Sequence, residues 1–446
     1  MNYINLQDLF LTPVYLLLIY GILFFMRTSI VDKEMKNYFI IGYTVKVIGA
    51  IFFGLVFQFV YGYGDTFFYF AGASIAREAF FNDMLSYWEI IFQNMDNYST
   101  PHTYYYAYRM PYYGDPGSFA VNKIGSIFSI LSFDTYTVNC LFFALLSFTG
   151  SWQMYKAWVD IYPMLKKQLA WAIFFVPSVF FWASGIVKDS VTFSALCFAF
   201  SAFHFGIIRR RKLYINILLL LVCFYTIYLI KLYILLCFIP ACGWWFYAQY
   251  SSQIKSQFLR FVFAPIFLVI GVGVAYYAFS NLIQGTEYDL DKVAQEAYIT
   301  ADWIHQMSTE GSAYDIGLDQ MDGTIQGLIK LYPKGIFITL FRPFIWEIKN
   351  FNMALAGLEN LVILFLTIRV FKNQKWATIL KRLRTHQMVV VCLIFTFFFS
   401  GIIGIVSSNF GTLVRYRIPV LPFYMIALVI LAYKPPKPKK LRRIKV

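Results

Sequence analysis

Charged side chains are scarce in this sequence. Lys, Arg, Asp and Glu make up only 14% of the 446 residues, whereas hydrophobic residues make up 59% and aromatic residues 21%. A soluble domain of this length needs far more charge to cover its surface, while a bilayer accepts apolar side chains on all sides of a helix. The composition therefore excludes an ordinary soluble protein and predicts a chain that crosses a membrane several times.

Cysteine and histidine are also rare. The six cysteines lie inside apolar runs, where we expect small core residues, so the sequence predicts no disulfide framework and no zinc site. An acidic stretch from Asp315 to Gly323 loosely resembles a cation site, but its spacing does not fit an EF-hand, and a solvated acidic loop is the simpler interpretation. No cofactor is expected. Whether the protein binds a divalent metal is left open, because no compact set of acidic ligands is evident.

The net charge of +15 would suggest a nucleic-acid partner in a soluble protein. Here the basic residues cluster in short loops and in the tail 434–446, as the positive-inside rule expects of cytoplasmic segments near anionic lipid. Nucleic acid is therefore not an expected partner, and membrane lipids are. No cleavable signal peptide is expected, because the first apolar run is long enough to span and has no basic region before it.

Windows of about 20 apolar residues predict an all-α polytopic transmembrane bundle of eleven spans. The distribution of basic loops places the N-terminus outside and the C-terminus in the cytoplasm. The expected location is the cell's inner (cytoplasmic) membrane. If one marginal apolar run is not a span, every segment that precedes or every segment that follows it moves to the opposite side of the membrane. The predicted spans are 10–26, 38–60, 135–151, 168–185, 190–207, 213–230, 232–249, 261–280, 351–370, 387–407 and 416–433.

Two long segments then fall on the outer face. The first, 62–134, holds the candidate catalytic acid. The second, 281–350, is an acidic loop with a helical pattern from Asp289, which could cap it, to about Met307, followed by a short apolar segment that can dip into the outer leaflet. Loops of this length are usually functional or disordered, and their Tyr and Trp content favours order.

Asp65 is the candidate catalytic residue. It lies where a long apolar run gives way to a polar, Tyr-rich segment, in Tyr61-Gly-Tyr-Gly-Asp-Thr-Phe-Phe-Tyr69. A carboxylate at the mouth of a membrane protein is suited to take a proton from a sugar hydroxyl. The alternative is that Asp65 is a solvated loop acid, so a catalytic role depends on which residues lie near it.

Five cations also fall near span ends on the predicted outer face. Such charges are costly unless they are paired or face a wet cavity, and a lipid-linked phosphate would supply the missing counter-charge. For Arg415 and Arg417 the alternative is snorkelling to lipid headgroups. For Lys188 with Asp189 it is a local salt bridge, in which Asp189 orients Lys188. The candidate substrate-binding residues are Lys188, Asp189, Lys231, Arg342, Arg415, Arg417 and Tyr69.

Three motifs resemble the GT-C superfamily of membrane glycosyltransferases, which transfer sugars from polyprenyl-phosphate carriers on the outer side of the membrane. Gly64-Asp-Thr-Phe-Phe-Tyr69 resembles the acid motif of the first outer loop, Pro177-Ser-Val-Phe-Phe-Trp-Ala-Ser-Gly-Ile-Val-Lys-Asp189 a span-and-turn element, and Arg415-Tyr-Arg-Ile-Pro-Val-Leu-Pro422 the closing span. The resemblance implies that Asp65 activates the acceptor, that the closing-span cations approach the donor phosphate, and that the partners are a polyprenyl-phosphate-linked sugar and a glycan or lipid acceptor of the cell envelope. The chain departs from the family in one extra span before the acid motif and in the lack of a soluble domain after the last span.

Other functions stay open at this point. A polysaccharide polymerase or ligase of the O-antigen type would place its chemistry on loop 281–333 and Arg342. A transporter would need polar residues through the midplane, where Lys46 is the one clear cation, and an internal repeat, of which there is no sign. A non-catalytic subunit of an envelope machine would neither bind nor consume a polyprenyl-phosphate sugar.

Overall fold

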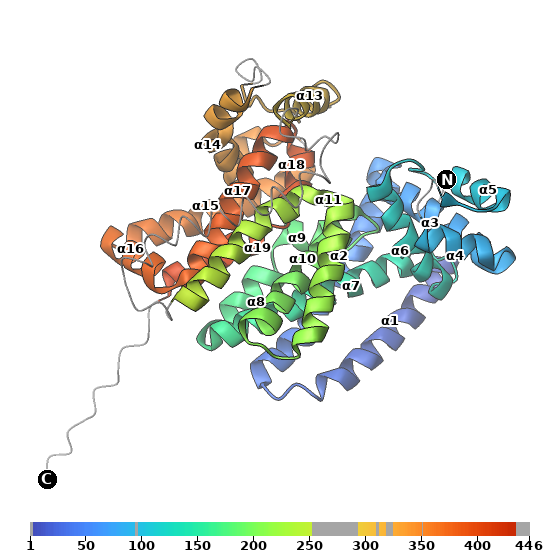
Figure 1. Ribbon diagram of the computed structural model, residues 1–446, viewed down its shortest axis with the longest axis horizontal. Coiled ribbons are helices and arrows are strands. Elements are labelled where there is room, and N and C mark those ends of the chain that lie inside the picture. Colours follow the sequence, from blue (N-terminus) through green and yellow to red (C-terminus); the bar gives the residue numbers. More distant parts are fainter. Residues whose placement is uncertain are drawn as a thin grey trace, which may run out of the picture.

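Helices make up the described part of the protein. The computed structural model describes residues 3–93, 97–251, 293–308, 312–317, 324–349 and 351–433, and within them no β-strand occurs beyond one isolated bridge between Ala313 and Asn409. The predicted all-α class is therefore confirmed. The helices, shown in Figure 1, are α1 (Leu6–Arg27), α2 (Lys33–Val56), η1 (Phe57–Tyr61), α3 (Asp65–Asn82), α4 (Met84–Phe92), α5 (Pro101–Arg109), α6 (Pro116–Leu131), α7 (Tyr136–Ile161), η3 (Pro163–Leu165), α8 (Lys166–Phe174), α9 (Pro177–Trp182), α10 (Lys188–Ala202), η4 (Phe203–Ile208), α11 (Leu213–Tyr250), α13 (Val293–Gln306), α14 (Ile325–Phe341), η7 (Ile345–Glu347), α15 (Phe351–Asn373), α16 (Trp376–Thr385), α17 (Gln387–Val406), α18 (Phe410–Tyr416) and α19 (Leu421–Ala432).

Six helices of the described residues are long and apolar enough to cross a membrane, or up to eight if each of two bent helix pairs counts as one span. The prediction of eleven spans is not confirmed, and the predicted span 261–280 lies outside the described residues. The six are Leu6–Arg27, Lys33–Tyr61, Lys188–Ile208, Leu213–Tyr250, Met353–Asn373 and Gln387–Val406.

The predicted span 168–185 is wrong as a continuous helix. Its two pieces, α8 and α9, are separated by Phe175 and Val176, and Val176 has an extended backbone. Proline at 177 explains the break, because its ring disfavours a helical conformation in the preceding residue. The predicted last span, 416–433, likewise consists of the end of α18 and all of α19, which are bent by 67°.

Helix α11 folds back on itself at Lys231. Its backbone there is extended (φ −150°, ψ 74°), and a straight helix of 38 residues would be about 57 Å long. Both ends nevertheless lie beside η4: a Cβ at Gly206 would meet Asn216, and the Tyr250 hydroxyl donates to the Ile207 carbonyl at 3.2 Å. Figure 1 shows the two arms meeting at a bend, as the separate predictions of 213–230 and 232–249 require.

The basic loops gather at one end of the bundle, which we call the basic end. Lys166 pairs with Asp32, joining the α1–α2 loop to α8. Asp160 at the end of α7 accepts hydrogen bonds from Arg209 and from buried His204 at 2.8 Å each. The loop before α17 joins the same end, since the His386 and Tyr162 rings lie 5.9 Å apart. These described loops therefore lie at one end of the bundle, as expected, and their location on the cytoplasmic side stays a prediction.

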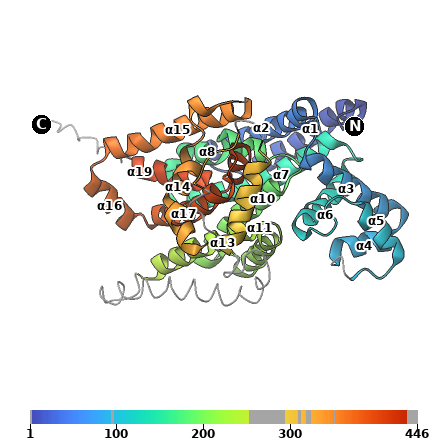
Figure 2. The ribbon, with the colours of Figure 1, turned by 90° about the horizontal axis from the view of Figure 1, so that it is seen from above.

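Segment 62–134 is mostly helical. It forms α3 to α6, which have their own small apolar core around Ala76, Tyr87 and Phe119. Figures 1 and 2 both show these four helices together at one end of the molecule. Helices α3 and α6 connect this group to the main bundle, because α3 begins at Asp65 and α6 is followed by α7 after a bend of 116°.

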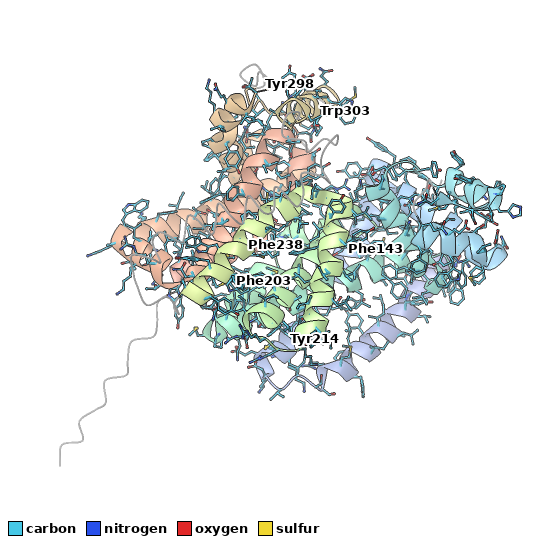
Figure 3. The ribbon with its side chains drawn as sticks, in the orientation of Figure 1. Phe143, Phe203, Tyr214, Phe238, Tyr298 and Trp303 are labelled. Atoms are coloured by element: carbon cyan, nitrogen blue, oxygen red, sulfur yellow. The ribbon has the colours of Figure 1, made fainter. Side chains whose placement is uncertain are left out.

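The second long segment is described in part. Helix α13 confirms the helical pattern that was predicted up to Met307, but Asp289 lies outside the described residues, as do 318–323 of the acidic stretch. Helix α14 packs tightly on α17, because a Cβ at Gly404 would lie 2.1 Å from the Gly335 carbonyl oxygen. Figure 3 shows Tyr298 and Trp303 of α13 at one margin of the molecule and Phe143, Phe203 and Phe238 within the bundle.

Candidate functional site

A glycine-dependent turn sets Asp65 at the start of α3. The π-helix η1 ends α2, Gly62 adopts a left-handed conformation, and Gly64 has a φ of +151°. A Cβ at Gly64 would lie 2.4 Å from the Phe57 ring, so only glycine fits between the two helices. Asp65 is therefore the first residue of α3, at the end of the bundle opposite the basic end, which we call the site end.

Arg415 connects two carboxylates at the site end. Its guanidinium donates to Asp65 at 3.0 Å and to Asp189 at 2.5 Å. The second oxygen of Asp189 accepts from Lys231 at 2.5 Å, and the Lys231 ammonium lies 4.6 Å from the centre of the Tyr416 ring. The side chain of Asp189 is 3% exposed and that of Asp65 is 46% exposed. Arg415 is thus anchored on a buried acid and reaches toward a solvent-accessible one.

Tyr112 is the second partner of Asp65. Its hydroxyl donates to the other carboxylate oxygen at 3.1 Å. Burial, and then the charge of Asp65, raise the pKa of Tyr112, so it stays a hydrogen-bond donor. Its φ of +65° is a left-handed conformation that costs a bulky residue about 1–3 kcal/mol. The neighbouring Tyr69 is 2% exposed, and its hydroxyl lies 3.3 Å from that of Ser118.

Lys188 pairs with Asp115 rather than with its sequence neighbour Asp189. The ammonium lies 3.1 Å from the Asp115 carboxylate, which also caps α6 through the backbone N–H groups of Gly117 and Ser118. Burial alone would raise the pKa of Asp115, but the Ser118 hydrogen bond and the charge of Lys188 lower it below its usual value. The interpretation that Asp189 orients Lys188 is therefore wrong, because the Asp189 oxygens are engaged by Lys231 and Arg415.

A cavity of about 630 Å³ opens beside Asp65 and Arg415. Aromatic and aliphatic side chains of α2, α9 and α15 form most of its wall, while Asp65, Arg415, Glu359 and a few hydroxyl and amide groups form its polar part. Its lining residues are Ile48, Phe52, Phe57, Tyr61, Tyr63, Gly64, Asp65, Pro177, Ser178, Phe180, Phe181, Trp182, Met353, Leu355, Ala356, Glu359, Asn409, Phe410, Gly411, Thr412, Val414, Arg415 and Tyr416. Of the predicted site residues, this wall contains Asp65 and Arg415. It does not contain Lys188, Asp189, Lys231, Arg342, Arg417 or Tyr69.

Arg417 and Arg342 do not share the cavity with Arg415. Arg417 is fully buried, donates to Glu359 at 3.0 Å and to the carbonyls of Thr339 and Arg342, and so holds the start of α19 against α14 and α15. Arg342 donates to Glu347 at 2.9 Å and lies over the rings of Phe410 and Tyr314. Each of the five predicted cations thus has a carboxylate partner within the described residues. The premise that they lack a counter-charge is wrong.

Sequence reasoning missed Glu359. Its carboxylate accepts from the Ser178 backbone N–H at 2.7 Å, from the Ser178 hydroxyl at 2.8 Å and from Arg417, and it lines the cavity. An acid inside an apolar run is a signal in itself, because intramembrane carboxylates are retained for function or pairing. Tyr112 and Asp115 were missed for another reason, since nothing local distinguishes them from other loop residues.

His102, His305 and Lys46 do not belong to the cavity wall. His102 is 81% exposed beside Asp83, and His305 belongs to α13. Lys46 is buried and donates to the carbonyls of Val179 and Ala183 at 3.3 and 3.2 Å. Within the described part of the chain, no group of three or more His, Cys, Asp and Glu side chains is arranged to hold a metal ion, and the six cysteines are free and buried.

Comparisons of the chain with protein-family models, with curated proteins and with solved structures find no match. The function therefore has to be argued from the geometry of this site.

Proposed function

We propose that this protein is a membrane glycosyltransferase that transfers a sugar from a polyprenyl-phosphate carrier to a lipid-linked or cell-envelope acceptor. One observation carries the proposal: Asp65 and Arg415, 350 residues apart in the chain, lie 3.0 Å from each other on the wall of one cavity. A base for a hydroxyl and a cation for a phosphate are the two groups that this transfer requires.

The shape of the cavity favours an amphipathic ligand. Along α2 and η1 its wall extends from Ile48 to Tyr61, which corresponds to about 20 Å of helix. Ile48, Phe52 and Leu355 are 57%, 38% and 41% exposed, so the apolar part of the wall opens toward surrounding lipid. A hydrocarbon chain placed there would bring its phosphate to Arg415 and Asp65 at the polar end.

The two contacts of Arg415 are suited to different tasks. Asp189 is buried and fixes the guanidinium from behind, whereas Asp65 faces the cavity. A donor phosphate would take the place of Asp65 at Arg415, because arginine offers planar donors that match phosphate oxygens. Asp65 would then be released to face the acceptor.

The reaction is a substitution at the anomeric carbon. Asp65 accepts the proton of the acceptor hydroxyl, whose oxygen forms the new bond to the anomeric carbon. The bond from that carbon to the phosphate oxygen breaks, and its electron pair leaves with the lipid phosphate. Arg415 stabilises the charge that grows on this leaving group, which lowers the barrier more than it stabilises the bound donor.

Substitution of Asp65 tests the proposal. The variants Asp65→Asn and Arg415→Gln are compared with wild type for binding of a synthetic polyprenyl phosphate to the purified full chain and for glycan output in cells lacking the native gene. Asp65→Asn should keep lipid binding and lose transfer by about 10²–10⁴-fold, the usual contribution of a general base. Arg415→Gln should lose binding. Asp83→Asn, which removes an acid outside the cavity, is the matched control.

A polymerase or ligase is the second candidate. The observation that favours it is the bridge between Ala313 and Asn409, which brings the segment before α14 to the cavity rim. Normal glycan output from stable Asp65→Asn protein would sink the transferase mechanism and favour this alternative. Failure of every variant, and of wild type, to bind polyprenyl phosphate would instead favour a non-catalytic subunit.

A further inference from the structure

The net positive charge of this protein comes from its last part. Residues 360–446 contain fifteen Lys and Arg and no Asp or Glu, so residues 1–359 contain 23 of each sign and are neutral overall. Two of the fifteen, Arg415 and Arg417, pair with acids from earlier helices. The others have no acidic neighbour in sequence, and those in the described residues surround α16.

Helix α16 and the turn that leads into it from the end of α15 expose basic and apolar side chains close together in the sequence. Lys372, Lys375, Lys381 and Arg384, which we call the α16 cations, are exposed. Among the described residues none of these four takes part in an ion pair. This contrasts with the site end, where every predicted cation is paired.

Between these cations lie large apolar side chains. Trp376 is 69% exposed, Leu380 is 53% exposed, and the Phe371 and Trp376 rings lie 5.4 Å apart. The opposite side of α16 is anchored to the bundle, because Ile379 is buried and Arg382 donates to the carbonyls of Leu431 and Tyr433. The orientation of the exposed face is therefore fixed.

Water does not favour exposed Trp and Leu, and the hydrocarbon core does not favour four unpaired cations. The headgroup layer accepts both, since aromatic rings and aliphatic side chains enter the acyl boundary while Lys and Arg reach phosphate. The position of α16 agrees with this, because it joins α15 to α17 at the basic end and lies at the left margin of Figure 1.

We infer that α16 lies in the membrane interface and that the α16 cations bind the headgroups of anionic phospholipids. Each cation close to an anionic surface contributes about 1 kcal/mol to lipid attraction, which corresponds to about fivefold in affinity. The inference does not depend on the proposed transferase activity, since it concerns the opposite end of the bundle from the cavity.

The lipid selectivity of the full chain tests the inference that the α16 cations bind anionic phospholipids. Purified protein in detergent is titrated with phosphatidylglycerol and with phosphatidylcholine, and bound lipids are counted by native mass spectrometry. The variant K372Q/K375Q/K381Q/R384Q should lose its preference for phosphatidylglycerol by about tenfold or more. The control K33Q/K167Q/R210Q/K212Q removes the same charge from exposed positions of other basic-end loops. It should lose much less of the preference for phosphatidylglycerol. Equal losses in the two variants, or no loss in the first, would overturn the inference.

A spin label at Leu380→Cys gives a readout independent of lipid counting. In phosphatidylglycerol-containing nanodiscs the label should be relaxed by oxygen and protected from a water-soluble nickel complex. Free access of the nickel complex would place α16 in water and overturn the inference, and competition by an acidic peptide would then identify a protein partner in place of lipid.

Discussion

At the scale of single residues, the site is a balanced set of charges. Asp65, Asp115 and Asp189 face Arg415, Lys188 and Lys231, and each buried charge has a direct partner. Asp189 is central because it is the only one of these acids that contacts two cations. Removal of one member should therefore lower the free energy of unfolding by more than the loss of one contact, since it leaves a charge without a partner in a low dielectric.

Asp189→Asn should destabilise the protein by roughly 3–5 kcal/mol, because it leaves Lys231 and Arg415 uncompensated. The double variant Asp189→Asn/Lys231→Met restores the charge balance and should recover part of that loss. Thermal unfolding in detergent measures both. A double variant as unstable as the sum of the two single variants would contradict a direct coupling.

Tyr112→Phe removes the hydroxyl that donates to Asp65 and keeps the ring. Hydrogen bonds to charged groups contribute roughly 1.5–3 kcal/mol, so under the proposed reaction kcat should fall by about tenfold. The KM for the donor should not change, because Tyr112 does not belong to the cavity wall. In an Asp65→Asn background the substitution should have no further effect, and the exposed Tyr105→Phe is the control. If Tyr112→Phe lowered kcat by the same factor in the Asp65→Asn background as in wild type, Tyr112 would act through packing alone.

At the scale of elements, breaks in helices position the chemistry. The π-helix η1 and two glycines precede Asp65, Pro177 separates α9 from α8, and extended backbone at Lys231 reverses α11. Short α9 is held by α2 at two levels: Lys46 donates to its terminal carbonyls, and Gly49 lies so close that a Cβ would meet the Phe180 carbonyl oxygen at 2.2 Å. The aromatic wall of the cavity is thus fixed from behind.

The basic end should show a pH-dependent contribution from the contact between the α1–α2 loop and α8. The hydrogen bond from Lys166, and then the backbone N–H of Met35, lower the pKa of Asp32. A lowered folded-state pKa stabilises the protein above the unfolded value of about 4, and this stabilisation is lost as the pH falls through the folded value. The stability difference between wild type and Asp32→Asn should therefore be present at neutral pH and vanish in acid. Glu34→Gln, in the same helical turn, should show no such difference at neutral pH.

At the scale of the whole molecule, the ends of the helices separate two chemical environments. The site end has paired charges and a cavity, and the basic end has clustered cations. Helix α2 runs from the basic end to the site end, α10 returns, and α11 goes to the site end and back. Because of this return, α11 brings Lys231 to Asp189 while both of its ends stay near η4.

Cysteine labelling of intact membranes should reveal the reversal of α11. Single cysteines at Tyr214 and Gln249, on its two arms, should react with an impermeant reagent from one side of the membrane, and a cysteine at Tyr63, which is 73% exposed beside the cavity, from the other. The native cysteines are buried and give a low background. Labelling of 214 and 249 from opposite sides would mean that α11 is one straight span.

Composition and local patterns of residues were enough to predict the environment and the class of fold, because both depend on local quantities. Scarce charge and long apolar runs require a helical membrane protein, and the spacing of basic loops predicted which connections share an end. The same reading selected Asp65 and Arg415. The pairing of acids with cations could not be predicted in this way. Lys188 pairs with Asp115, Arg417 with the overlooked Glu359, and Arg415 with acids 226 and 350 positions away. Such pairs form when distant helices approach one another, and no local pattern of residues encodes that approach.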